Sequence, residues 1–247
     1  MTRRLLVVAI VLGACWAASG APQYSPQYTV RAAGPYAGPT RSGAWIATPK
    51  RPVSARVDPT PRSRSLALLR SRTPARNVAR YLVTDSSRVG STVWVQVLLS
   101  GGERPVSGWV PATAVSVNRT GTRIELRLRT HSLVLLRAGR PLLRTWIATG
   151  REGTPTPSGL FAVREVVRHG RVVARALGPS AVALTATTPM PNDVASVDNR
   201  LAIVGLGRNS RRLLRRATTL GSVRVTDRVL ATITQAARAG TPVLIRE

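Results

Sequence analysis

The chain has 247 residues, of which 43% are hydrophobic, so it holds enough apolar material for one or two folded domains and is not wholly disordered. Its formal net charge is +27, carried almost entirely by arginine, because Lys50 is the single lysine among 37 basic residues. A charge of this size attracts anionic polymers, which include nucleic acid, phosphate-rich polymers and anionic lipid.

Residues 1–20 have the pattern of a secretory signal peptide. Arg3 and Arg4 form a positive start, residues 5–14 form an apolar run, and small residues follow. The apolar run is too short to span a bilayer permanently. The pattern predicts an exported protein, and export excludes nucleic acid as a partner.

Cys15 is the only cysteine, and two interpretations of it stay open. In the first, residues 12–15 form a lipobox, and a lipid on Cys15 gives the protein its only contact with the membrane. In the second, cleavage falls near residues 18–20 and Cys15 belongs to the discarded signal. Either way the folded part has no disulfide, no thiolate metal ligand and no cysteine nucleophile.

Two further regions precede the C-terminal half. Residues 21–60 are rich in Pro, Gly and Ser without periodicity, which predicts a flexible linker. Residues 61–119 predict a small β domain, because Val93–Leu98 alternates and turn residues separate it from Gly108–Pro111. Its Trp94 and Trp109 are expected to fill the core, as large aromatic residues usually do.

Residues 120–247 predict a second β domain. Arg123–Leu128 alternates strictly, as in a half-buried strand, and further strands are expected at 133–136, 142–148, 159–163 and 243–245. Prolines make the loop at 153–159 rigid. A helix is expected at 228–238, with Thr226 or Asp227 as its N-cap and Gly240 as its C-cap.

Three segments of this second domain carry a resemblance to a known family: residues 150–161, Ile203-Val204-Gly205 and residues 219–225. Together they resemble the catalytic domain of the L,D-transpeptidases, which cross-link bacterial peptidoglycan. Residues 61–119 resemble a small Src-homology-3-like barrel found before this domain in actinobacterial proteins. The resemblance implies a mostly β protein: a small Src-homology-3-like barrel, then an L,D-transpeptidase-type β-sandwich with one C-terminal helix before the last strand.

The resemblance also implies where the reaction centre lies. Ser222 stands at the position of the family's cysteine nucleophile, and Val204 and Leu220 stand at the positions of its two histidines. The interval of 222 − 204 = 18 positions agrees with the family. The remaining matches imply substrate-binding positions at Gly205, Gly221 and Arg224. Arg224 suits a substrate carboxylate, with a purely structural arginine as the open alternative.

A serine hydroxyl needs a base to act as a nucleophile, and the sequence offers none beside Ser222. The two histidines are His131, beside a turn, and His169, which with Gly170 is expected to form a hairpin turn. Lys50 lies in the predicted linker, and Asp227 is expected to cap the helix. Metal-ligand spacings and cofactor motifs are missing as well, so no metal and no cofactor are expected. Asp193 and Asp198 are interpreted as turn residues.

These observations favour an exported cell-wall protein of this family that is catalytically impaired and binds peptidoglycan. Its expected partners are peptidoglycan stem peptides and, through the net charge, anionic wall polymers. Two alternatives stay open. One is an active transpeptidase that uses Ser222 with a base not visible in the sequence, and the other is a stabilising partner of an active relative.

Overall fold

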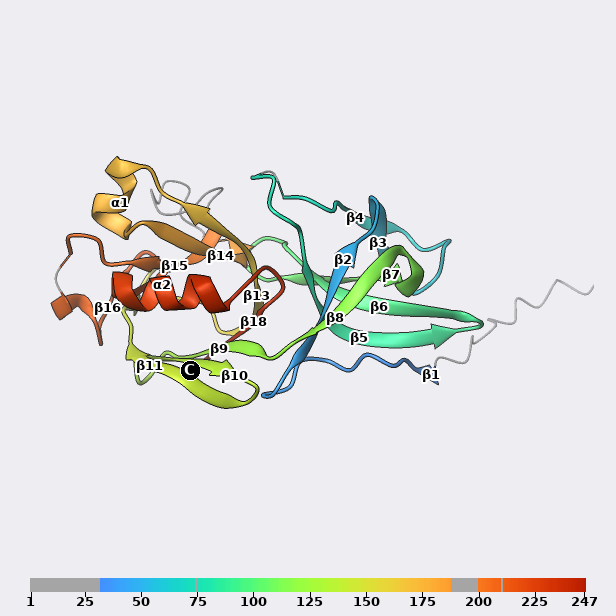
Figure 1. The fold of residues 1–247 in the computed structure, drawn as a ribbon, viewed down its shortest axis with the longest axis horizontal. Coiled ribbons are helices and arrows are strands. Elements are labelled where there is room, and N and C mark those ends of the chain that lie inside the picture. The colour runs from blue at the N-terminus through green and yellow to red at the C-terminus, as the bar shows by residue number, and fades with distance from the viewer. Residues whose placement is uncertain (1–31, 74, 188–199, 210) are drawn as a thin grey trace, which may run out of the picture.

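The computed structural model describes residues 32–73, 75–187, 200–209 and 211–247, and Figure 1 shows it as two β bodies side by side. The predicted signal peptide with Cys15, residues 21–31 of the predicted linker, and Asp193 and Asp198 lie outside the described residues. The predicted mostly β fold is confirmed. Among the described residues, no helix is long and apolar enough to cross a membrane.

The first body is an eight-stranded sheet in the order β4-β3-β7-β6-β5-β2-β8, with β1 paired to β5. Its elements are β1 (Ala32–Ala33), β2 (Ala44–Pro49), β3 (Val53–Arg56), β4 (Ser65–Leu69), β5 (Tyr81–Val89), β6 (Thr92–Leu99), β7 (Val106–Pro111), the 3-10 turn η1 (Ala112–Ala114) and β8 (Val115–Thr120). Trp94 and Trp109 are each 3% exposed, so their predicted place in the core is confirmed. The Src-homology-3-like identity of this body stays a prediction.

The flexible linker predicted for residues 21–60 does not extend through its second half, where residues 44–49 and 53–56 form strands. β2 lies between β5 and β8, and β3 lies between β4 and β7. Both strands bury small apolar side chains, with Ala47 and Ala55 fully buried. Strands of only six and four residues give little periodicity of their own, and they form here because distant partners, such as residues 115–120 beside β2, complete their hydrogen bonds.

The second body is an eight-stranded sheet in the order β11-β10-β9-β18-β13-β14-β15-β17, with a two-stranded sheet of β12 and β16 beside it. Its strands are β9 (Thr122–Arg127), β10 (Ser132–Arg137), β11 (Arg140–Trp146), β12 (Thr149–Gly150), β13 (Gly159–Arg168), β14 (Ser180–Thr187), β15 (Arg200–Gly205), β16 (Ala217–Thr219), β17 (Val223–Val225) and β18 (Pro242–Arg246). Ala148, just after β11, forms a bridge with Arg224 on β17, so the two ends of the sheet approach each other.

Among the described residues of this body, two α-helices and the 3-10 turn η3 (Arg211–Leu213) accompany the strands. The helix predicted at 228–238 is α2 (Asp227–Ala236), and the Thr226 hydroxyl caps it by accepting from the Val229 amide. The predicted cap at Gly240 is wrong, because the helix ends at Ala236 and Gly240 forms the turn before β18.

The other helix is α1 (Arg171–Leu177). It begins directly after His169 and Gly170, in place of the expected hairpin turn. Val172 and Val173 suggest a strand by propensity, but their segment begins after Gly170 and ends at Gly178, which has φ +76°. Val173 and Leu177, four positions apart, lie on one face of the helix and pack against the sheet. Burial of this face, which depends on tertiary packing, outweighs the local preference for a strand.

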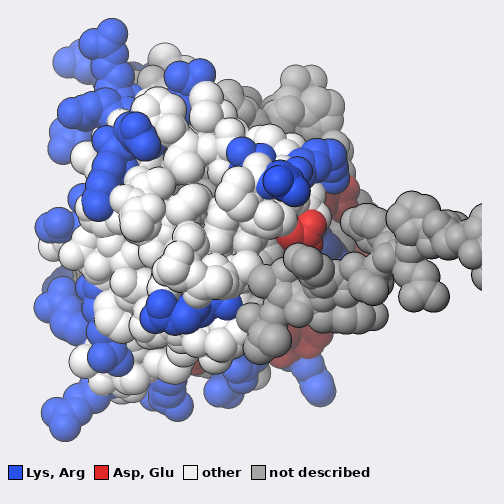
Figure 2. Space-filling view, turned by 90° about the vertical axis from the view of Figure 1, so that its right-hand side faces the viewer, with Lys and Arg blue, Asp and Glu red and all other residues white. Residues whose placement is uncertain are grey.

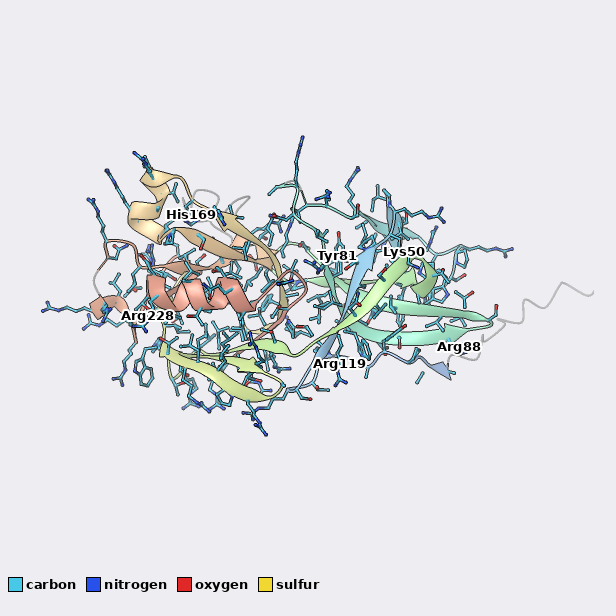
Figure 3. All side chains as sticks on the ribbon, in the orientation of Figure 1. Lys50, Tyr81, Arg88, Arg119, His169 and Arg228 are labelled. Carbon is cyan, nitrogen blue, oxygen red and sulfur yellow. The ribbon has the colours of Figure 1, made fainter. Side chains whose placement is uncertain are left out.

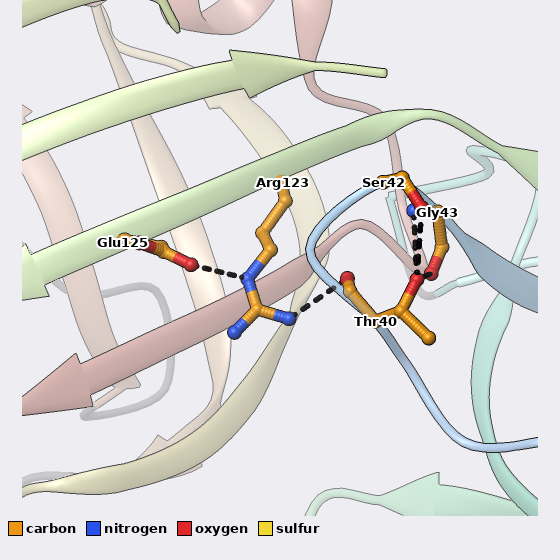
Figure 4. A network of polar contacts seen from close by, with 5 residues as sticks. All are labelled: Thr40, Ser42, Gly43, Arg123 and Glu125. Atoms are coloured by element: carbon orange, nitrogen blue, oxygen red, sulfur yellow. Dashed lines mark hydrogen bonds and ion pairs between the residues drawn. The ribbon is translucent and has the colours of Figure 1, made fainter. Parts of the chain in front are cut away.

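Apolar and polar contacts join the two bodies. Ala44, Leu82 and Leu98 of the first sheet form one buried cluster with Ala162 of β13. Nearby, the buried Arg123 of β9 pairs with Glu125 at 2.9 Å and donates to the Thr40 carbonyl at 2.9 Å (Figure 4). The segment before β2 is therefore fixed to the second body.

Candidate functional site

The candidate site lies where β15 and β17 run side by side in parallel. Val204 pairs with Arg224, and Ile203 pairs with Val223. Because side chains alternate along a strand, Arg224 and Val204 share one face of the sheet, and Ser222 directly precedes β17. Ile203 and Val223 point the other way, into the main core against α2. The structure therefore brings three of the predicted site residues together, with Leu220 half-buried in the loop just before Ser222.

Val204, which the resemblance predicts to stand at the position of a family histidine, lies in an apolar environment. It is fully buried in a cluster with Leu177, Ala181 and Ala202, and Val173 of α1 packs against the same cluster. Thus α1 covers the site face of β14 and β15, while α2 covers their opposite face (Figure 1). The space around Val204 is filled by aliphatic side chains.

Ser222 has a buried hydroxyl, and no activating group contacts it in the part of the chain that the structure describes. The residue is 3% exposed, and its Oγ has no hydrogen-bond partner among the described residues. A buried hydroxyl without a partner costs about 1–3 kcal/mol of desolvation. An unpaired hydroxyl also keeps its proton, because proton removal requires a base within hydrogen-bond reach.

Both histidines are held by other groups. His131 Nδ1 lies 3.1 Å from the Thr149 hydroxyl, and His169 Nδ1 lies 2.8 Å from the Gly178 carbonyl oxygen. Figure 3 shows His169 beside α1, at the end of β13. Lys50 donates to the Thr113 carbonyl in the first body. None of these described side chains is hydrogen-bonded to Ser222.

Asp227 has a different role from the predicted cap. It is the first residue of α2, and its Oδ1 accepts from the Gly207 amide at 3.1 Å. Its carboxylate also lies against Gly205 and Gly178, so that a Cβ on Gly205 would meet it. A glycine is therefore needed at 205, because the backbone at Gly205 packs closely against Gly178 and Asp227. This packing is a structural reason for the glycine at 205.

The loop around Ser222 is held by a frame of threonines. Thr156 Oγ1 donates to the Gly221 carbonyl at 2.7 Å and accepts from the Gly150 amide at 2.8 Å. Thr154 Oγ1 donates to the Thr219 carbonyl, and the Thr219 hydroxyl donates to the Ser222 carbonyl. The loop predicted at 153–159 thus lies against the segment that precedes Ser222, the predicted nucleophile position. Gly221 has φ +106°, which only glycine adopts readily.

Arg224 is anchored within the protein. Its Nη1 donates to the carbonyl of Ala176 in α1 at 2.9 Å. This bond supports the structural alternative for Arg224 and ties α1 to β17. A role in binding substrate stays a prediction for Arg224, Gly205 and Gly221.

One exposed aromatic side chain near the site was not predicted from the sequence. Trp146, at the end of β11, is 47% exposed, and the Arg215 guanidinium lies 4.4 Å from its ring centroid. Two residues later, Ala148 bridges Arg224. The available signal was the polar pair Arg144 and Thr145 just before the tryptophan, which is typical of an exposed edge strand and not of a core strand.

A family model and several solved structures match this chain. The model described as the L,D-transpeptidase catalytic domain (YkuD) matches residues 121–245. Among solved structures, an L,D-transpeptidase from Mycobacterium smegmatis is 14% identical, with 87% of this chain and 97% of that chain covered and a TM-score of 0.44. The catalytic domain of the E. faecium L,D-transpeptidase is 21% identical, with 50% and 95% covered and a TM-score of 0.33. No curated protein matches. The family model covers about half of the chain, including every predicted site residue, and the chain belongs to the L,D-transpeptidase catalytic-domain family.

Proposed function

We propose that this protein is an exported cell-wall member of its family that binds peptidoglycan stem peptides and is impaired in acyl transfer. The observation that carries the proposal is the environment of Val204, which is fully buried among aliphatic side chains where the family has a histidine. The buried Ser222 hydroxyl without a partner among the described residues supports it. A thiolate nucleophile forms near neutral pH, whereas a serine without a base keeps its proton.

The retained frame supports binding. Threonine hydrogen bonds hold the loops at 154–156 and 219–222 against each other, as a preorganised peptide site requires. Trp146 offers an exposed aromatic surface on the neighbouring strand end. These features fix the shape of the site without any contribution from a catalytic side chain.

The first test is intact-mass spectrometry after incubation with tetrapeptide-stem muropeptides, with Ser222→Ala as the control. We expect no mass gain in either protein. An adduct on the wild-type chain that is missing from Ser222→Ala would overturn the impairment and establish the alternative, a serine acyl-enzyme.

The second test is retention on purified peptidoglycan from which phosphate polymers have been stripped. We expect the wild-type chain to be retained, and Arg224→Gln to be retained less than Arg228→Gln, a variant of equal charge on the exposed side of α2. Equal retention of both variants would remove Arg224 from the binding site, and no retention of the wild-type chain would refute peptidoglycan binding.

A further inference from the structure

A cavity of about 270 Å³ lies where the two bodies meet. The first body lines it with residues of β4, of the segment between β4 and β5, of the start of β5 and of the end of β6. The second body lines it with Arg164 of β13 and Thr185 of β14. Four of its lining residues are arginines, namely Arg70, Arg72, Arg80 and Arg164, and none of the described lining residues is acidic. The cavity therefore gathers positive charge from both bodies.

A second hollow of about 260 Å³ adjoins the same surface. It is lined by Arg80, Arg119 and Arg238, together with residues of β2, β8 and the turn after α2. We call the six arginines of the two hollows the arginine seam: Arg70, Arg72, Arg80, Arg119, Arg164 and Arg238. Arg80 lines both hollows, so the two hollows are neighbours.

The carboxylate beside the first hollow is engaged in holding the two bodies together. Glu165 is 6% exposed, accepts from the Thr73 hydroxyl at 2.9 Å and from Asn77 at 3.4 Å, and lies 3.7 Å from Arg164 Nε. These contacts fix the segment that follows β4 to β13. Glu165 thus offsets part of the charge of one arginine of the seam.

Two other arginines of the seam make contacts that do not neutralise them. Arg72 Nη1 donates to the Arg76 carbonyl at 2.9 Å, and the Arg119 guanidinium lies 5.8 Å from the Trp45 ring centroid. A carbonyl and an aromatic ring position a guanidinium and leave its full positive charge in place. The seam therefore keeps a strong net positive charge.

The chemistry of the seam selects its ligand. Guanidinium groups bind phosphate through paired, parallel hydrogen bonds, and like charges gathered in a hollow raise the local potential for anions. Basic side chains also far outnumber acidic ones on the end of the molecule that Figure 2 shows. Two adjoining hollows with a shared arginine match an anion that repeats along a chain. We propose that the arginine seam binds a phosphate-bearing linear polymer.

The test measures binding of inorganic polyphosphate to the full chain by fluorescence anisotropy. Arg70→Gln/Arg80→Gln is compared with Arg88→Gln/Arg228→Gln, which removes the same charge at the two ends of the molecule (Figure 3). We expect affinity to fall about tenfold or more in the seam variant and by less than about twofold in the control, with a shallower salt dependence in the seam variant. Equal losses in the two variants would overturn the seam as a site.

Further arms identify the ligand and guard against misfolding. A poly-glycerol-phosphate chain should bind like polyphosphate, and poly-glutamate should bind more weakly; equal binding of poly-glutamate would overturn the preference for phosphate. The double variant Arg119→Gln/Arg238→Gln, in the second hollow, should also weaken polyphosphate binding. The thermal unfolding temperature of each seam variant should match that of the wild-type chain. Retention on phosphate-stripped peptidoglycan should survive in all seam variants, which separates this inference from the proposed function.

Discussion

The face that carries Val204 and the arginine seam differ in both packing and charge. Around Val204 the side chains are aliphatic and closely packed, and α1 covers this face. At the seam, six arginines surround two hollows. Aliphatic side chains fill the space beside Val204, whereas at the seam the gathered arginines line hollows of about 270 and 260 Å³.

The largest expected effect comes from Gly205→Ala, which breaks the packed site. The new Cβ would meet the Asp227 carboxylate and lie 2.9 Å from Gly178 Cα, so the free energy of unfolding should fall by about 3 kcal/mol. Gly170→Ala is the matched control, since its Cβ meets nothing within 4 Å. Urea unfolding measures both, and similar values for the two variants would contradict the close approach.

Leu177→Ala tests whether α1 fills the site. Leu177 is 3% exposed beside Val204, so its truncation should lower the free energy of unfolding by about 2–3 kcal/mol. Val172→Ala, on the exposed side of the same helix, should cost less than about 0.5 kcal/mol in the same urea unfolding measurement. Polyphosphate affinity should not change in either variant. A small cost for Leu177→Ala would mean that the helix is not held by this cluster.

Thr156→Val tests the frame around Ser222. The substitution removes the hydroxyl that donates to the Gly221 carbonyl and accepts from the Gly150 amide. The free energy of unfolding should therefore fall by about 1–2 kcal/mol. Thr156→Ser keeps the hydroxyl and should recover most of this loss. Stem-peptide retention should fall with Thr156→Val, and a loss of stability without a loss of retention would separate the frame from binding.

The smallest expected effect is a pH dependence of the free energy of unfolding, caused by Tyr81, which lines the first hollow. Burial raises the pKa of the Tyr81 phenol above its ordinary value of 10.0, against smaller opposing effects of a backbone hydrogen bond from Arg70 and the charge of Arg164. Above about pH 10 the unfolded chain loses this proton first, so the free energy of unfolding should fall as pH rises through the raised pKa. Tyr81→Phe should reduce this fall. Unfolding curves at about pH 9 and about pH 11 measure it, and identical pH dependence in both proteins would contradict the burial of the phenol.

The sequence by itself determined the features that depend on neighbouring residues. Alternation predicted strands such as Arg123–Leu128, and Thr226 identified the start of α2. Such signals are local, because a strand's period and a helix cap involve only a few consecutive residues. The altered reaction centre at residues 204, 220 and 222 stays a prediction.

Tertiary structure decided the rest, because it depends on which distant segments meet. Only the fold places α1 over Val204, although Val172 and Val173 favour a strand locally. Only the fold gathers arginines between positions 70 and 238 into one seam. Burial and long-range pairing, which no short window of sequence contains, supply the free energy for both arrangements.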